Sequence, residues 1–134
     1  MNYVIDKTQK HPYLDGMYRL CKDGVGIGWI GEGARIGEGA VIGKGAVIGE
    51  GAVIGEGAEI KSIYDYMTVG GIGSRQDMTT FYCCKDGLIR VNYGCFNGTL
   101  DEFEDAAHET HAGNEHEKAY MAAIRMAKEI MIHD

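Results

Sequence analysis

The hydrophobic and polar positions along the chain follow three different patterns in turn. Residues 1–23 hold two short apolar runs on either side of a loop at Pro12, which favours a small N-terminal β cap. Residues 24–63 follow a strict period of six. Residues 64–134 begin with β-branched and aromatic runs, which predict strands, and end with the spacing of amphipathic helices. The chain therefore divides into a cap, a repeat and a C-terminal module.

The repeat places an isoleucine at every sixth position from Ile30 to Ile60, with an alanine two residues before each one from Ile36 onward. A helix would hold about a dozen interior glycines here, each roughly 1 kcal/mol less favourable than alanine. A flat strand would place the isoleucines and charged residues such as Glu32 on one face, because side chains alternate with a period of two. We therefore predict that the chain turns once per hexad and that the short strands stack as a parallel β-helix.

The pattern A-x-I-G-x-G, from Ala34 to Ala58, resembles the hexapeptide repeat of left-handed parallel β-helices, known best from acyltransferases. The resemblance implies three hexads per coil and hence about two coils. Because so short a stack buries little surface alone, it further implies a homotrimer. The fold class that we predict is α+β, mainly β: a short left-handed parallel β-helix of about two coils, followed by a β-hairpin and two α-helices.

The C-terminal module has strong local signals. Two β-branched and aromatic runs flank Lys85-Asp86-Gly87, which predicts a hairpin of residues 78–84 and 88–93. Residues 62–69 read as a strand that leaves the repeat. Thr99 with Glu102, and Asn114 with Glu117, have the spacing of helix N-terminal capping boxes. The second helix, which we expect to end at about Ile132, carries one apolar stripe: Tyr120, Ala123, Ile124, Ala127, Ile130 and Met131.

Charge and composition narrow the possible partners. The 134 residues carry a net charge of −7, of which residues 99–134 contribute −6, so a nucleic-acid polymer is an unfavourable partner. No run approaches the roughly 18 apolar residues of a membrane span, and residues 1–10 lack the apolar centre of a signal peptide. We expect a cytoplasmic protein with no membrane partner. Its four cysteines show no C-x-x-C spacing, and we expect reduced thiols.

One cluster suggests an anion site in this acidic chain. A glycine loop supplies backbone N–H groups, arginines supply forked guanidinium donors, and threonines supply hydroxyls, which together suit a phosphate or carboxylate. Nearby aromatic residues could stack on a ring. The residues that we predict to bind a ligand are Gly73, Ser74, Arg75, Thr79, Thr80, Phe81 and Arg90, and Tyr64, Tyr66 and Tyr82 are further candidates for stacking.

Catalytic, cofactor and metal signals are weak. The G-x-G-x-x-G string that begins at Gly26 precedes no helix, so we expect no dinucleotide cofactor. The spacing of His108, His111 and His116 matches no zinc motif, and we expect no metal. The repeat contains no histidine, so an acyltransferase of this type would have to use His11 or His111 as its base. We therefore expect no catalytic residues and no enzyme activity, with acyl transfer as the enzymatic alternative.

Residues 72–120 resemble a C-terminal module of uncharacterised proteins from bacteriophages and mobile elements, carried by Ile72–Phe81, by Asp86–Val91 and by Gly94–Phe103. The resemblance implies a phage context, and hence the host cytoplasm. We expect a homotrimer that sequesters a small anionic ligand, such as a nucleotide signal of bacterial defence, without catalysis. An alternative is an interaction protein that binds a host protein through its acidic helix residues, Asp101, Glu102, Glu104 and Asp105. The sequence assigns no role to Cys95.

Overall fold

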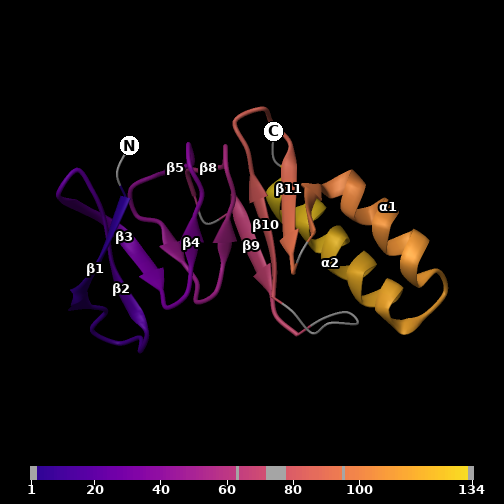
Figure 1. Cartoon of the computed structure of the whole chain (residues 1–134), viewed down its shortest axis with the longest axis horizontal. Helices are drawn as coiled ribbons and strands as arrows, with labels where there is room; N and C mark the ends of the chain where they lie inside the picture. The colour runs from indigo at the N-terminus through magenta and orange to yellow at the C-terminus, as the bar shows by residue number, and fades with distance from the viewer. Residues whose placement is uncertain (1–2, 63, 72–77, 95, 133–134) are drawn as a thin grey trace.

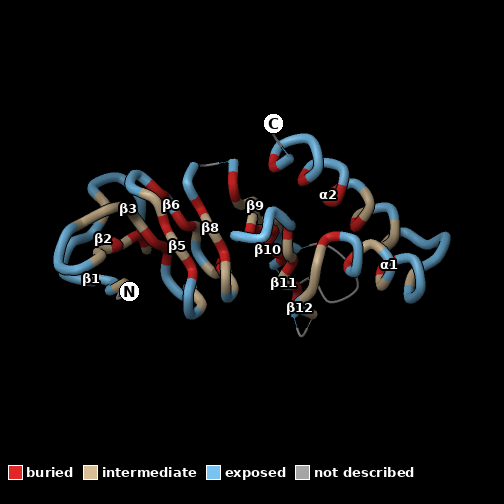
Figure 2. Tube along the Cα trace, turned by 90° about the horizontal axis from the view of Figure 1, so that it is seen from above, coloured by how far each residue is buried: buried red, intermediate tan, exposed pale blue. Residues whose placement is uncertain are grey.

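Three layers follow one another along the longest axis of the molecule (Figure 1). The computed structural model describes residues 3–62, 64–71, 78–94 and 96–132. The N-terminal strands and the repeat form one end, a four-stranded sheet lies in the middle, and two helices cover the far side of that sheet. Buried residues gather in two clusters, one inside the repeat and one between the sheet and the helices (Figure 2).

The N-terminal strands lie against the start of the repeat. Strands β1 (Tyr3–Lys10), β2 (Met17–Lys22) and β3 (Val25–Gly31) pair antiparallel in that order. The pairing of β1 with β2 runs from Tyr3 to Asp6, shifts in register, and resumes at Lys10. Strand β3 belongs to both parts of the molecule, since its other edge pairs in parallel with a later strand of the repeat.

The repeat forms short strands that pair with strands three hexads away. The pairs β3–β6, β4–β7 and β5–β8 are all parallel, and each joins a residue to the one 18 positions later, such as Ile30 to Ile48. The chain thus returns beside its own start after three hexads; the handedness of the coil stays a prediction. The bounds are β4 (Arg35–Ile36), β5 (Val41–Ile42), β6 (Val47–Ile48), β7 (Val53–Ile54) and β8 (Glu59–Ile60).

The two glycines of each hexad serve different needs. The second one, represented by Gly45, adopts a φ of +89° at the corner, a conformation that side chains disfavour. The first one, represented by Gly31, has an ordinary φ but lies directly against the next coil. Of the six isoleucines, five are at most 3 % exposed, which confirms that they point inward. Ile36 is half-buried and lines an open pocket beside β1.

The central sheet is larger than the hairpin that the sequence predicts. Strands β10 (Thr79–Cys83) and β11 (Ile89–Tyr93) confirm that hairpin, and β9 (Tyr66–Val69) and β12 (Phe96–Thr99) extend it on either side. The predicted strand over 62–69 is a strand only from Tyr66. Strand β12 was not expected, because Phe96 to Thr99 is short and contains a glycine, and its pairing with β11 supplies what its local propensity lacks.

Helices α1 (Leu100–His111) and α2 (Glu115–Met131) begin at the predicted caps. Thr99 and Glu102 form the reciprocal capping box. Asn114 accepts from the first turn of α2, but Glu117 accepts from the N–H of Gly113 instead of closing a box with Asn114. The predicted apolar stripe is buried except for Ile130, which is 40 % exposed because it lies past the edge of the sheet-facing surface.

Strand β10 closes the C-terminal end of the coil. The Thr80 hydroxyl accepts from the N–H of Val53 at 3.1 Å, and the N–H of Lys85 donates to the carbonyl of Gly57 at 3.1 Å. Tyr82 is 1 % exposed and belongs to the hydrophobic cluster of the repeat. These contacts join the sheet to the second coil, so the repeat and the C-terminal module pack as neighbours rather than as separate units.

Candidate functional site

A small pocket opens at one end of the central sheet, where the two helices meet β11 and β12. Its volume is about 210 Å³. This is close to the roughly 150 Å³ of a cavity that holds a single benzene ring. The sheet supplies two aromatic rings, α1 supplies a phenyl ring, an imidazole ring and a small-residue wall, and α2 closes the other side. The lining residues are Tyr93, Phe96, Phe103, Ala106, Ala107, Thr110, His111 and Tyr120.

Phe103 lies at the centre of this aromatic pocket. Its ring centroid is 5.4 Å from that of Phe96 and 5.5 Å from that of Tyr120, and the latter pair is edge-to-face. Tyr93 lies 5.5 Å from Tyr120 in the same arrangement. Edge-to-face packing holds such rings in defined orientations. The pocket therefore has a rigid aromatic wall, of the kind that takes a flat ring.

Polar groups lie beside the rings of the pocket. The Tyr120 hydroxyl donates to the Tyr93 hydroxyl at 3.0 Å. The His111 ring lies 5.6 Å from the Tyr120 ring and 5.2 Å from the ring of His116. A ring bound among the aromatic side chains would thus meet hydroxyl and imidazole groups at its edge, which is how small-molecule pockets fix orientation.

The structure separates the predicted ligand-binding residues. Because paired residues of an antiparallel sheet share a face, Thr79 and Phe81 face the helices, while Thr80 and Arg90 face the repeat. Thr79, Thr80 and Phe81 are each at most 1 % exposed. The predicted Gly73, Ser74 and Arg75 lie outside the described residues. The four described positions therefore do not line one common pocket.

Arg90 lies in a separate groove of about 430 Å³ between the sheet and the repeat. Both of its terminal nitrogens contact the carboxylate of Asp86, at 3.0 and 2.8 Å. This bidentate pair, together with a hydrogen bond that the guanidinium donates to Cys84, raises the pKa of Arg90, and the Arg90 guanidinium lowers the pKa of Asp86. Arg90 and Asp86 thus form a bidentate ion pair within the chain, as is typical of a structural contact.

The aromatic residues that we predict to stack on a ring do not line the aromatic pocket. Phe81 and Tyr82 are core residues, and the Tyr66 hydroxyl accepts from the N–H of Gly49 and donates to the carbonyl of Val47. Tyr64 is 55 % exposed. Sequence reasoning instead missed the rings of the aromatic pocket, since it assigned Tyr120 to the helix stripe and gave Phe96 no place. A clue was available in the density of aromatic residues between positions 93 and 103.

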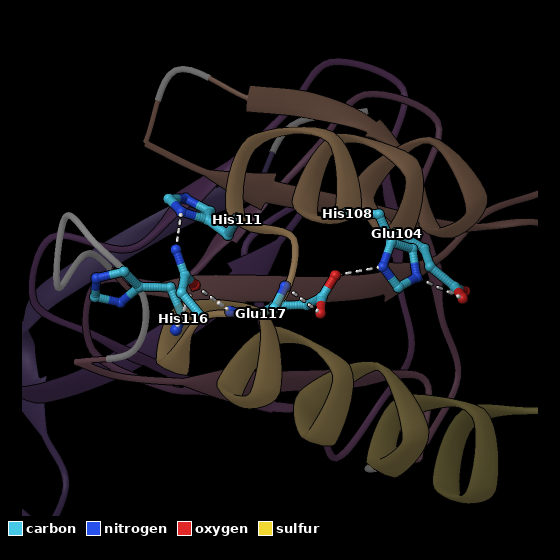
Figure 3. A network of polar contacts seen from close by, with 7 residues as sticks. Glu104, His108, His111, His116 and Glu117 are labelled. Carbon is cyan, nitrogen blue, oxygen red and sulfur yellow. Dashed lines mark hydrogen bonds and ion pairs between the residues drawn. The ribbon is translucent and has the colours of Figure 1, made fainter.

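The histidines of the helical hairpin have polar partners along one side (Figure 3). His108 lies between two carboxylates, with its Nδ1 2.6 Å from Glu117 and its Nε2 3.7 Å from Glu104. The hydrogen bond to Glu117 raises the pKa of His108. In the described part of the chain, no group of three or more histidine, cysteine, aspartate or glutamate side chains is placed to hold a metal ion.

The remaining titratable candidates, His11 and the cysteines, contact other parts of the fold. The Nδ1 of His11 accepts from the backbone N–H groups of Tyr13 and Leu14, both at 3.1 Å, and its ring lies 4.7 Å from Trp29. Cys83 and Cys84 are free thiols, and burial raises the pKa of Cys83 to about 11. A thiol with so high a pKa is a poor nucleophile at neutral pH. Cys95 lies outside the described residues.

Comparison with known proteins found one family match, which lies within the repeat. Residues 28–62 match the family described as Bacterial transferase hexapeptide (six repeats). This match supports the predicted hexapeptide repeat over about the same residues. A search of curated proteins found no match. A search of solved structures found none either. Among the helices of the described residues, none has the length and apolar character needed to cross a membrane.

Proposed function

We propose that this protein is a non-catalytic binding protein that forms a homotrimer through its hexapeptide repeat and sequesters a small anionic ligand carrying a flat ring. The aromatic pocket carries the proposal: an open pocket of about 210 Å³ is lined by five rings, from Tyr93, Phe96, Phe103, His111 and Tyr120. A nucleotide is the ligand class that combines a flat base with an anionic group. The proposed role is retention of such a molecule in a phage or mobile-element setting.

The register of the sheet relates the described ends of the connection between β9 and β10 to Tyr93. Val69, at the end of β9, and Thr79, at the start of β10, are ladder partners, and Thr79 is in turn the partner of Tyr93 in the pocket wall. The predicted anion-binding residues, Gly73 to Arg75, belong to the chain between Val69 and Thr79. The two described ends of that connection thus lie beside the pocket.

The size of the repeat supports the proposed trimer. The coil makes two layers of strands, and parallel layers about 4.8 Å apart give a stack too short to bury much surface. Val47, on the outer side of β6, is 39 % exposed. Proteins with this repeat often form trimers, which would cover such outward residues.

Release of a bound molecule from the purified protein tests the proposal. Native mass spectrometry should show a trimer, and denaturation should release about one equivalent of a ring-bearing anion per chain. Ala106→Leu adds a side chain into the pocket, and we expect it to lower the retained ligand about tenfold or more. Ala122→Leu, which adds the same side chain on the exposed side of α2, is the matched control and should retain the ligand.

Two further results decide the proposal. Arg75→Ala should weaken retention while the trimer stays intact, as the predicted anion site requires. An empty protein, or equal retention by the Ala106→Leu and Ala122→Leu variants, would remove the pocket from consideration. A monomer at micromolar concentration would contradict the homotrimer.

Acyl transfer is the second candidate, because the matched family is described as a transferase family. The candidate base His11 uses its Nδ1 to hold the loop that follows it, and the coil has only two layers of strands in the described residues. If the chain is an acyltransferase, it should release free thiol from acetyl-coenzyme A in the presence of an amine or hydroxyl acceptor, and His11→Ala or His111→Ala should abolish the release. We expect no turnover above the buffer control.

A further inference from the structure

Beside the aromatic pocket, the carboxylate of Glu117 on α2 contacts both α1 and the connection between the two helices. One oxygen of Glu117 accepts from the N–H of Gly113 in the connection, at 3.0 Å. The other lies 2.6 Å from the Nδ1 of His108 on α1. Figure 3 shows the Glu117 carboxylate directed toward the His108 ring. We call this set of contacts, made by His108, Gly113 and Glu117, the helix clasp.

The helix clasp shares its backbone segments with the pocket wall. On α1, His108 lies between Ala107 and Thr110, which both line the pocket. On α2, Glu117 lies three residues before Tyr120, almost one helical turn, so the two side chains project from neighbouring positions of the helix. The helix clasp and the two helix walls of the pocket therefore lie on the same turns of α1 and α2.

The charges around His108 all favour its protonated form. Glu117 of α2 and Glu104 of α1 face its two ring nitrogens, and the nearest cation in this chain of contacts, Lys128 of α2, lies 3.2 Å from Glu104. Glu117 is also in the first turn of α2, where the helix dipole stabilises a carboxylate. Glu117 thus stays ionised, and the proton on His108 decides whether the clasp is an ion pair.

The direction of the pH effect follows from the two partners. The hydrogen bond to Glu117 raises the pKa of His108 above 6.5. The stabilisation that protonated His108 gives to the clasp is therefore complete below pH 6.5 and is lost as the pH rises through the raised pKa. The Gly113 N–H and His108 lower the pKa of Glu117 below 4.5. The stabilisation that ionised Glu117 gives to the clasp is therefore complete above pH 4.5 and is lost as the pH falls through the lowered pKa. The clasp is strongest between these two values.

We propose that the helix clasp positions the α1 and α2 walls of the aromatic pocket and loosens as His108 loses its proton, which makes the pocket sensitive to pH near neutrality. The proposal rests on the proposed function only in naming the pocket as a ligand site. Glu117 and His108 are positioning residues, since neither lines the pocket.

Nuclear magnetic resonance of the full chain without any ligand tests this inference. From about pH 5 to about pH 8.5, the Gly113 amide, the Thr110 methyl group and the Tyr120 ring should shift together with the His108 imidazole. His108→Gln should abolish this shared pH response, and Glu117→Gln should move the His108 midpoint down. Glu115→Gln, which removes a carboxylate from the same turn, is the control and should behave as the parent protein does.

Two outcomes would overturn the inference. One is a pH response of Thr110 and Tyr120 that persists in the His108→Gln variant. The other is a His108 midpoint that Glu117→Gln leaves unchanged. Because the experiment contains no ligand, it stands or falls independently of whether a nucleotide or any other molecule binds in the pocket.

Discussion

Gly31→Ala is expected to destabilise the protein by about 3 kcal/mol, the upper range for overpacking a close contact. A Cβ at position 31 would lie 2.5 Å from the Cα of Glu50 and 2.8 Å from the carbonyl carbon of Gly49. Both atoms belong to the backbone of the next coil, so no side-chain rotation can relieve the overlap. The β3–β6 ladder would have to separate. Chemical denaturation at fixed protein concentration measures the loss.

Gly49→Ala is the matched control, because Gly49 occupies the same position of the hexad one coil later. A Cβ there meets nothing within 4 Å, and its φ is not in the left-handed region. We expect a change within about 0.5 kcal/mol. Equal losses in the two variants would show that the glycine is needed for backbone conformation and not for the approach of the coils. The chain itself places a lysine, Lys61, at this position where no further coil follows.

The neighbouring threonines Thr79 and Thr80 should respond to valine in opposite directions. Both are at most 1 % exposed. The Thr80 hydroxyl accepts from the N–H of Val53 at the end of the coil, and its removal leaves that N–H without an acceptor. Thr80→Val should therefore cost about 2 kcal/mol, the penalty of a buried unsatisfied group. Thermal unfolding should show a melting temperature lower by roughly 6 °C.

Thr79→Val should leave stability unchanged or raise it by up to about 1 kcal/mol. Within the described residues, the Thr79 hydroxyl is buried without a hydrogen-bond partner, so a methyl group of the same shape removes an uncompensated polar group. The two substitutions are chemically identical and one residue apart, which cancels any general preference of valine for strands. A larger loss for Thr79→Val than for Thr80→Val would contradict the hydrogen bonding described here.

Much of the fold can be predicted from the sequence, because the patterns that specify it are local. The hexad period alone predicts where the inward isoleucines and corner glycines lie, and the match of residues 28–62 to the hexapeptide family supports it. The Lys85-Asp86-Gly87 turn predicts the central hairpin, and Thr99 with Glu102 predicts the start of α1. Each of these signals depends on contacts within a few residues or on one repeating unit.

The candidate site is much harder to predict from the sequence, because its residues meet through tertiary contacts. One pocket residue, Tyr93, comes from a strand, while Phe103 and Tyr120 come from two helices. Their spacing in the sequence does not predict that they line one pocket. The predicted Thr79, Thr80 and Arg90 are close in sequence or in the hairpin, yet strand alternation sends Thr79 to one face of the sheet and the other two to the opposite face. Sequence proximity therefore suggested a cluster that the sheet divides.

The sequence by itself determined the elements of this protein, and the tertiary structure decided which surfaces those elements share. A repeat of isoleucine, alanine and glycine can satisfy its backbone only by turning and stacking, so its coil follows from composition and period. Which ring touches Phe103, which face Arg90 occupies and which carboxylate reaches His108 depend on how β10 caps the coil and how two helices cross the sheet. Those contacts join residues far apart in the chain, where local propensity carries no information about the partner.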